Sequence, residues 1–282
     1  MTYTMDEILK QAGELPPLPQ VAQKALTILR NPNSNMHELA DVLILDQAMT
    51  SLILRWVNSA YFGLWNPVST VHQAVVYLGQ RTLESLVLAA SVVNLLSKPI
   101  PGYGLEQGDL WKHSIGVAAG ARLIAKRIGY EDPEVAYHAG LLCDIGKLVL
   151  GVLLQKPEVH VEEWVGKPFS EFEEAYFGVD HATLGAELAK QWNLPEPLQV
   201  AIACHHKPST AGNYAVLAST VHMSDAMLMM MGIGLGKDGL QYTLDPGAFR
   251  FVDWKGAKIN DLFDRVLSVV QEAEAFVGMP MK

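Results

Sequence analysis

The spacing of apolar residues is the feature that most constrains what this chain can fold into. Apolar side chains recur every three or four residues over long stretches, and runs of strictly alternating apolar and polar residues are almost absent. Pro, Gly and Asn punctuate the helical segments. The sequence therefore predicts an all-α protein, with a short hairpin conceivable only within 243–254. The expected helices cover about 6–11, 19–29, 35–43, 46–60, 71–78, 81–96, 109–128, 133–154, 169–177, 181–192, 195–204, 213–231 and 259–277.

Two helical lobes are expected. Residues 98–104 contain two prolines and two glycines, which end one helix and delay the next. A chain of 282 residues also suits two domains. We therefore place an N-terminal helical bundle at 1–98 and a second helical lobe, with a C-terminal extension, at 99–282.

Charge and cysteine content narrow the class of protein. The chain carries 21 Lys and Arg against 30 Asp and Glu, a net charge of −9, so nucleic acid is an unlikely partner unless a local basic face exists. Two cysteines cannot build a disulfide framework, and the N-terminus lacks the pattern of a signal peptide. Uninterrupted apolar runs are far shorter than the ~20 residues of a spanning helix. We expect a cytoplasmic protein that does not cross a membrane.

The second lobe contains histidines and aspartates at positions suited to metal binding. In helical bundles, metal sites use His and carboxylates that project inward from separate helices. Imidazole and carboxylate ligands suit Fe, Zn, Mn or Mg, and two adjacent histidines can serve two ions. Spacing alone also allows these residues to be surface or hydrogen-bonded core groups, with no metal. The candidates, each on its own helix or helix end apart from one adjacent pair, are His113, Asp144, His181, His205, His206 and Asp225.

The segment around Asp144 reads His138-Ala-Gly-Leu-Leu-Cys-Asp-Ile-Gly-Lys147. It resembles the core motif of the HD superfamily of metal-dependent phosphohydrolases, in which a His-Asp pair follows Gly-Leu-Leu and precedes Ile-Gly-Lys. The resemblance implies that the six candidates above are metal ligands, and that Asp144 and Lys147 take part in catalysis if the site is active. It continues in order through Trp111-Lys-His113-Ser, Val179-Asp-His181-Ala-Thr-Leu-Gly185, Cys204-His205-His206-Lys-Pro208 and His222-Met-Ser-Asp225.

The first lobe carries a second set of motifs: Leu15-Pro-Pro-Leu-Pro19, Leu45-Asp46-Gln47, Val57-Asn-Ser-Ala-Tyr-Phe-Gly63 and Val71-His-Gln-Ala-Val-Val-Tyr-Leu-Gly79. These resemble HDOD, the HD-related output domain of bacterial signalling proteins. That module joins an N-terminal helical lobe to an HD-like lobe, and the resemblance covers roughly residues 5 to 235.

Cys143 departs from the HD pattern, because catalytic members have His before the Asp. The thiol can be a small buried residue, since free Cys is often buried. It can instead be a thiolate ligand, which Zn or Fe accepts, or it can lie beside a metal that the other residues hold. Loss of one imidazole is expected to weaken metal binding, so the site is predicted to be impaired for hydrolysis.

Other candidate residues are given structural roles. Asp109 either caps a helix or joins His113 as a ligand. His138 is six residues before Asp144 and falls on another helix face. The glycine-rich stretch 232–237 lacks the context of a phosphate loop and is expected to end a helix. The remaining histidines without a partner at matching spacing are His37, His72, His160 and His222, and the aromatic cluster expected at the lobe interface or a partner surface is Trp56, Tyr61, Phe62 and Trp65.

The favoured hypothesis is a cytoplasmic bacterial signalling module that binds a signalling protein or a small ligand such as a nucleotide, and that is more a regulator than an enzyme. The alternative is a metal-dependent phosphohydrolase acting on a nucleotide or cyclic dinucleotide. The sequence is silent on the oligomeric state.

Overall fold

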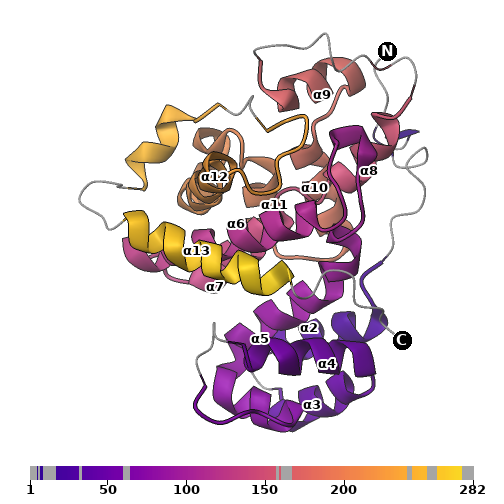
Figure 1. Cartoon of the computed structure of the whole chain (residues 1–282), viewed down its shortest axis with the longest axis vertical. Helices are drawn as coiled ribbons and strands as arrows, with labels where there is room; N and C mark the ends of the chain where they lie inside the picture. Colours follow the sequence, from indigo (N-terminus) through magenta and orange to yellow (C-terminus); the bar gives the residue numbers. More distant parts are fainter. Residues whose placement is uncertain are drawn as a thin grey trace.

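The computed structural model confirms the all-α prediction (Figure 1). It describes residues 5, 7–8, 17–31, 34–59, 64–156, 159, 167–239, 243–252 and 259–274, and within these residues there is no strand. A single bridge pairs Ile100 with Leu105. Most of the predicted 6–11 helix, and also Tyr61, Phe62 and His160, lie outside the described residues.

The described residues of the N-terminal part include the helices α2 (Gln20–Arg30), α3 (Met36–Ile44), α4 (Gln47–Val57) and α5 (Val71–Leu96). Side-chain caps begin three of them, because the oxygen atoms of Asn35, Asp46 and Thr70 accept backbone N–H groups of the first turns. The predicted helices 71–78 and 81–96 join into one bent element. The bend lies at Gly79, whose φ of 73° is a conformation that favours glycine.

In the second part, the described residues form α6 (Asp109–Ile128), α7 (Pro133–Leu142), α8 (Lys147–Leu153), α9 (Phe169–Phe177), α10 (His181–Gln191), α11 (Glu196–Ala203), α12 (Ala215–Met230) and α13 (Ile259–Glu274). Short 3-10 helices lie at η1 (Pro101–Tyr103), η3 (Pro208–Thr210), η4 (Gly212–Tyr214) and η5 (Pro246–Arg250). The η5 helix lies within 243–254, the stretch in which the sequence allows a short hairpin.

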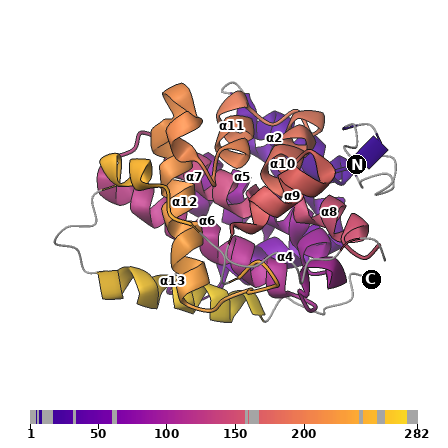
Figure 2. The ribbon, with the colours of Figure 1, turned by 90° about the horizontal axis from the view of Figure 1, so that it is seen from above.

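Helix α6 is the centre of this second part. It packs against α7, α12 and α13, while α8, α9 and α10 lie together, apart from α13 (Figure 2). The indole N–H of Trp111 on α6 donates to the carbonyl oxygen of Ala273 on α13, at 3.1 Å. Its ring also packs on Trp56 of α4, with centroids 5.6 Å apart. One hydrophobic core therefore runs through both parts, and the domain boundary at residue 98 stays a prediction.

The two alternatives for the aromatic cluster, the lobe interface or a partner surface, divide between its residues. Trp56 is buried between the two parts, as expected for an interface anchor. Trp65 is 100% exposed, so it is not an interface anchor, and a partner surface remains the prediction for it. Its loop precedes α5 and holds the ring away from the core.

The single helix expected over 133–154 is wrong. Helix α7 ends at Leu142, residues 143–146 form a turn, and α8 begins at Lys147. The turn packs against the backbone of α10, where a Cβ on Gly146 would lie 2.0 Å from the carbonyl oxygen of His181. Periodicity cannot reveal this contact, because both segments are apolar. As a result Asp144 lies in a turn and not on a helix face.

The stretch Pro133–Leu153 has the length and hydropathy of a membrane span, but 83% of its most apolar window is buried inside the fold.

Candidate metal centre

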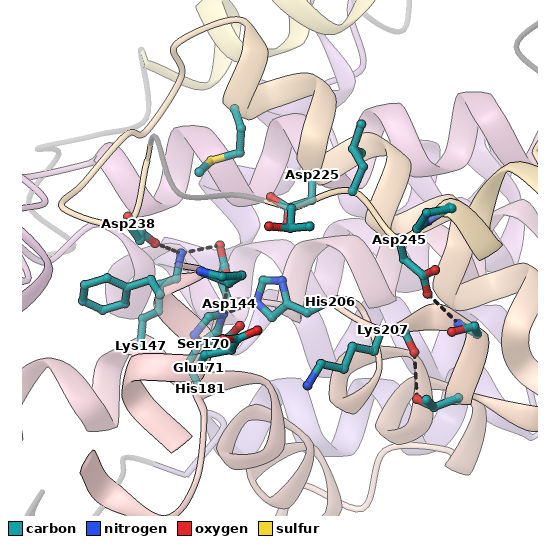
Figure 3. A pocket seen from close by; sticks show the side chains of 18 residues that line it. Asp144, Lys147, Ser170, Glu171, His181, His206, Lys207, Asp225, Asp238 and Asp245 are labelled. Carbon is teal, nitrogen blue, oxygen red and sulfur yellow. Dashed lines mark hydrogen bonds and ion pairs between the residues drawn. The ribbon is translucent and has the colours of Figure 1, made fainter. Parts of the chain in front are cut away.

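All six predicted ligands meet at one place in the second part. They come from α6 (His113), the turn after α7 (Asp144), the start of α10 (His181), the turn after α11 (His205 and His206) and α12 (Asp225). Figure 3 shows Asp144, His181, His206 and Asp225 facing a common space. Three groups have ligand atoms within 4.8 Å of one another: His181 with His205 and His206, Cys143 with Asp144 and His205, and His113 with Asp144 and Asp225.

Asp144 is the centre of this cluster. Its Oδ1 lies 3.2 Å from His181 Nε2 and 3.8 Å from His205 Nε2. Its Oδ2 lies 3.1 Å from Lys147 Nζ and 3.4 Å from His113 Nε2. Burial alone would raise the pKa of the carboxyl group, but Lys147, His181 and His113 hold that pKa well below its usual range. Asp144 is therefore an ionised, fully buried carboxylate.

His113 is held at both ring nitrogens. Nε2 lies 2.9 Å from Asp225 Oδ1, and Nδ1 lies 3.0 Å from the carbonyl oxygen of Ile233. Burial opposes protonation, but the hydrogen bond and charge of Asp225 outweigh it and raise the pKa of His113. The same pairing lowers the pKa of Asp225 against the effect of burial. The two side chains thus form a buried ion pair.

Glu173 orients His181, and the sequence analysis missed it. Its Oε2 accepts both the ring Nδ1–H of His181 at 2.6 Å and the backbone N–H at 2.8 Å. Its Oε1 accepts the hydroxyl of Tyr103 at 2.6 Å. Burial lowers the pKa of His181, yet the charges of Glu173 and Asp144 raise it to about 10. A carboxylate behind an imidazole is the usual way to fix a metal-binding histidine.

A signal for Glu173 was present in the chain. It shares the buried face of α9 with Phe169, Phe172 and Phe177. A lone carboxylate within an apolar stripe must have a polar partner when the stripe is buried.

The two adjacent histidines differ in their contacts. His206 Nε2 lies 2.9 Å from His181 Nε2. His205 has Nδ1 2.7 Å from the carbonyl oxygen of Ile202, while its Nε2 is buried and has no hydrogen-bond partner among the described residues. Burial lowers the pKa of both rings, most strongly for His206, where the neighbouring histidines add to the effect. Neutral imidazoles are the form that binds metals.

His222 supports this turn from behind. His222 is a buried residue outside the set of ligand candidates, and both of its ring nitrogens make hydrogen bonds. Nδ1 donates to the carbonyl oxygen of His205 at 2.7 Å, and Nε2 accepts the backbone N–H of Asp245 at 2.9 Å. It therefore ties the turn that carries His205 to the segment that includes Asp245.

Lys147 and Asp238 form a second buried contact that sequence reasoning missed. The Lys147 ammonium lies 2.6 Å from Asp238 Oδ2 as well as 3.1 Å from Asp144 Oδ2 (Figure 3). Asp238 directly follows the glycine-rich stretch 232–237. That stretch does end α12, as predicted, with Gly232 at a φ of 73°. Nothing local in the sequence marks Asp238, because its partner is 91 residues away.

Cys143 is fully buried and its thiol donates to the carbonyl oxygen of Gly140 at 3.3 Å. Burial raises the pKa of this thiol well above its usual value, with Asp144 and Asp225 adding to the effect. These contacts favour the interpretation of Cys143 as a small buried thiol, although its sulfur still lies within reach of the Asp144 group.

The residues set aside on sequence grounds have local partners. Asp109 is the first residue of α6, and its carboxylate accepts the N–H of Glu106 and pairs with Lys112 at 3.1 Å. His138 is buried against Ser85. His72 lies near the surface, 3.6 Å from Asp41, and its ring is 5.7 Å from that of His37.

The donor set fits a divalent cation. Imidazole nitrogens and carboxylate oxygens converge from five elements, and the buried Nε2 of His205 makes no hydrogen bond among the described residues. Such mixed nitrogen and oxygen ligands suit Fe, Mn or Zn. Beside the cluster lies a pocket of about 320 Å³. Its lining combines charged groups (Asp144, Lys147, Glu171, Lys207, Asp225, Asp238) with apolar ones (Pro168, Phe169, Met229, Leu244, Pro246).

Solved structures with the same architecture are known. An HDOD domain protein of unknown function from Geobacter sulfurreducens is 25% identical, with a TM-score of 0.77 over 98% of this chain and 100% of that one. A phosphohydrolase candidate from Shewanella amazonensis SB2B is also 25% identical, with a TM-score of 0.71 over 94% of this chain and 97% of that one.

Among curated sequences, an uncharacterized protein of Treponema pallidum (strain Nichols) is 28% identical over 231 residues, which is 78% of this chain and 44% of the relative. Ribonuclease Y of Lawsonia intracellularis is 36% identical over 123 residues, which is 42% of this chain and 18% of the relative. The chain thus spans less than half the length of the curated relatives that it matches. The family model of the HDOD domain matches residues 15–208, and with both parts of the fold included in that match, the chain belongs to the HDOD domain family.

Proposed function

We propose that this protein is a bacterial, cytoplasmic signalling module that binds a small ligand or a protein at the Asp144 pocket, and that its HD-type site is impaired in hydrolysis. The observation that carries the proposal is that protein groups already neutralise the charge of the Asp144 carboxylate. Its two oxygens already face Lys147 and two histidines whose pKa is raised, so its charge is balanced by groups of the protein itself. Cys143, where catalytic HD proteins have His, offers a buried thiol and not an imidazole.

The ligand would enter the 320 Å³ pocket. Charged groups and apolar side chains such as Phe169 and Leu244 both line this pocket, which suits a ligand with one polar and one flat apolar part. A nucleotide has this character. The solved proteins of this architecture include one from Marinobacter aquaeolei VT8 that is named for a role in signal transduction.

A second candidate is a metal-dependent phosphohydrolase acting on a nucleotide or cyclic dinucleotide. It is favoured by the convergence of all six ligand candidates and by the similarity to the Shewanella phosphohydrolase candidate. In this case His113, Asp144 and Asp225 would hold one ion, with the three remaining histidines able to hold another. The metal would supply an activated water molecule. Glu173 would keep His181 oriented, and Lys147 would face the phosphate.

The test begins with the metal content of protein purified without chelator. Nucleotides and cyclic dinucleotides are then offered to the full chain and to Asp144→Ala, with Asp41→Ala as the matched control, because Asp41 is an exposed carboxylate far from the pocket. We expect ligand binding that Asp144→Ala abolishes and Asp41→Ala preserves, without turnover in any variant. Metal-dependent turnover that only Asp144→Ala abolishes would refute the proposal and establish the enzyme.

A further inference from the structure

The Lys147 side chain is unusual because it is a buried cation at a place suited to a metal ion. Lys147 is 6% exposed, and its ammonium lies between two carboxylates, 3.1 Å from Asp144 Oδ2 and 2.6 Å from Asp238 Oδ2. A buried ammonium needs such partners, since an unpaired one would lose its hydration without compensation. Both contacts are therefore part of what keeps Lys147 inside the fold.

The position of Lys147 bears directly on cation binding. Asp144 shares a group of possible ligand atoms with His113 and Asp225, and its Oδ2 lies 3.4 Å from His113 Nε2. Lys147 donates to that same oxygen. A divalent cation and the ammonium are both attracted to this carboxylate, and their like charges repel each other. A cation bound at Asp144 must therefore weaken or displace the Lys147 contact.

Asp238 is a second carboxylate partner that can hold the Lys147 ammonium when its contact with Asp144 is weakened. Its contact with the ammonium is the shorter of the two, and its own segment is anchored, because the N–H of Lys237 donates to the carbonyl oxygen of Tyr103 at 2.7 Å. Asp238 also lies outside residues 15–208, the part that matches the HDOD family model. The segment after α12 thus contributes a buried carboxylate to a site whose other members precede it.

We propose that the Lys147 ammonium is an internal competitor for divalent cations at Asp144, and that Asp238 is the carboxylate that retains Lys147 when a cation binds. This inference rests on the proposed function, since it concerns cation binding at the same site. The Lys147 ammonium contacts both of the buried carboxylates Asp144 and Asp238. Removing that positive charge leaves an excess of negative charge that favours a divalent ion.

The experiment is a Mn²⁺ titration of the full chain. Binding is measured by calorimetry and, independently, by the electron paramagnetic resonance signal of free Mn²⁺. Lys147→Met keeps the length of the side chain and removes its charge, and we expect it to bind Mn²⁺ roughly tenfold or more tightly than the wild type. Lys207→Met is the matched control. Lys207 lines the same pocket but is exposed, so Lys207→Met shows how much any loss of a nearby positive charge changes the Mn²⁺ affinity. We expect this change to be far smaller than that caused by Lys147→Met.

Asp238→Asn provides the opposite change. With only Asp144 as a carboxylate partner, Lys147 competes more strongly, so Mn²⁺ affinity should fall several-fold; in the Lys147→Met background the same substitution should have a much smaller effect. Equal Mn²⁺ affinity of wild type and Lys147→Met, equal gains in both lysine variants, or an undiminished Asp238→Asn effect in the double variant would each overturn the inference. If Lys147→Met does not fold, Lys147→Gln and the Asp238→Asn result decide it. None of these readouts depends on turnover, which tests the proposed function separately.

Discussion

His138 permits a quantitative prediction about stability and pH. The imidazole is buried between α5 and α7, and its Nε2 lies 2.9 Å from the hydroxyl oxygen of Ser85. The Ser85 hydroxyl donates to Glu134 Oε2 at 2.7 Å, so the His138 ring donates to Ser85. Burial, together with the nearby Arg30 and Arg122, lowers the pKa of His138 to about 3. The ring is therefore neutral in the folded protein at every pH where the protein is normally handled.

The sign and size of the effect follow from proton linkage. An unfolded chain has a His pKa of about 6.5, so below that pH the unfolded state binds a proton that the folded state refuses. Stability due to His138 is thus complete above pH 6.5 and is lost as the pH falls from there toward 3. Between pH 7.5 and 5.5 the loss amounts to about 1.4 kcal/mol, because protonation of the unfolded histidine rises from about one-tenth to about nine-tenths over this interval while the folded histidine stays neutral.

The assay is urea unfolding of the wild type and of His138→Gln at pH 7.5, 6.5 and 5.5. Gln keeps an N–H donor for Ser85 but has no titration in this range. Every other group titrates alike in both proteins, so the difference in unfolding free energy isolates His138. We expect the wild type to lose about 1.4 kcal/mol more than the variant between pH 7.5 and 5.5. A constant difference across the three pH values would refute the reasoning.

Two further predictions concern the turn that holds Asp144. Gly146→Ala should lower the unfolding free energy by about 2 kcal/mol or more, because the new Cβ would lie 2.0 Å from the His181 carbonyl oxygen. Gly185→Ala on the facing helix is the control, since its new Cβ would have no neighbouring atom closer than 3.1 Å. This variant should lose clearly less unfolding free energy in the same urea titration. A smaller loss for Gly146→Ala than for Gly185→Ala would contradict the close packing of the two backbones. Cys143→His should raise Mn²⁺ affinity roughly 10- to 100-fold by restoring an imidazole beside Asp144 and His205, at a packing cost of about 1–3 kcal/mol. Cys143→Ala should leave the affinity unchanged in calorimetry, and a large decrease would identify the thiol as a ligand.

The fold class was predictable because helical periodicity and caps are local properties. Asn35, Asp46 and Thr70 begin helices where the chain reads as expected, and the predicted α6 agrees with the structure at both ends. The prediction of one continuous helix fails at residues 143–146 because of a tertiary contact. There the chain turns because Gly146 meets the backbone of α10, and an apolar stretch on either side hides the break.

The same division applies to the site. The sequence by itself determined the six ligand candidates, since residue chemistry together with the resemblance to the HD motif selects His113, Asp144 and their companions. Only the tertiary structure revealed Glu173, His222 and Asp238, which act through partners brought together by packing and not by spacing. The physical reason is that a ligand is recognised by its own chemistry, whereas a supporting residue is defined by what it contacts. Lys147 illustrates both sides of this division. The sequence shows a lysine in a motif, and the fold places its charge between two buried carboxylates.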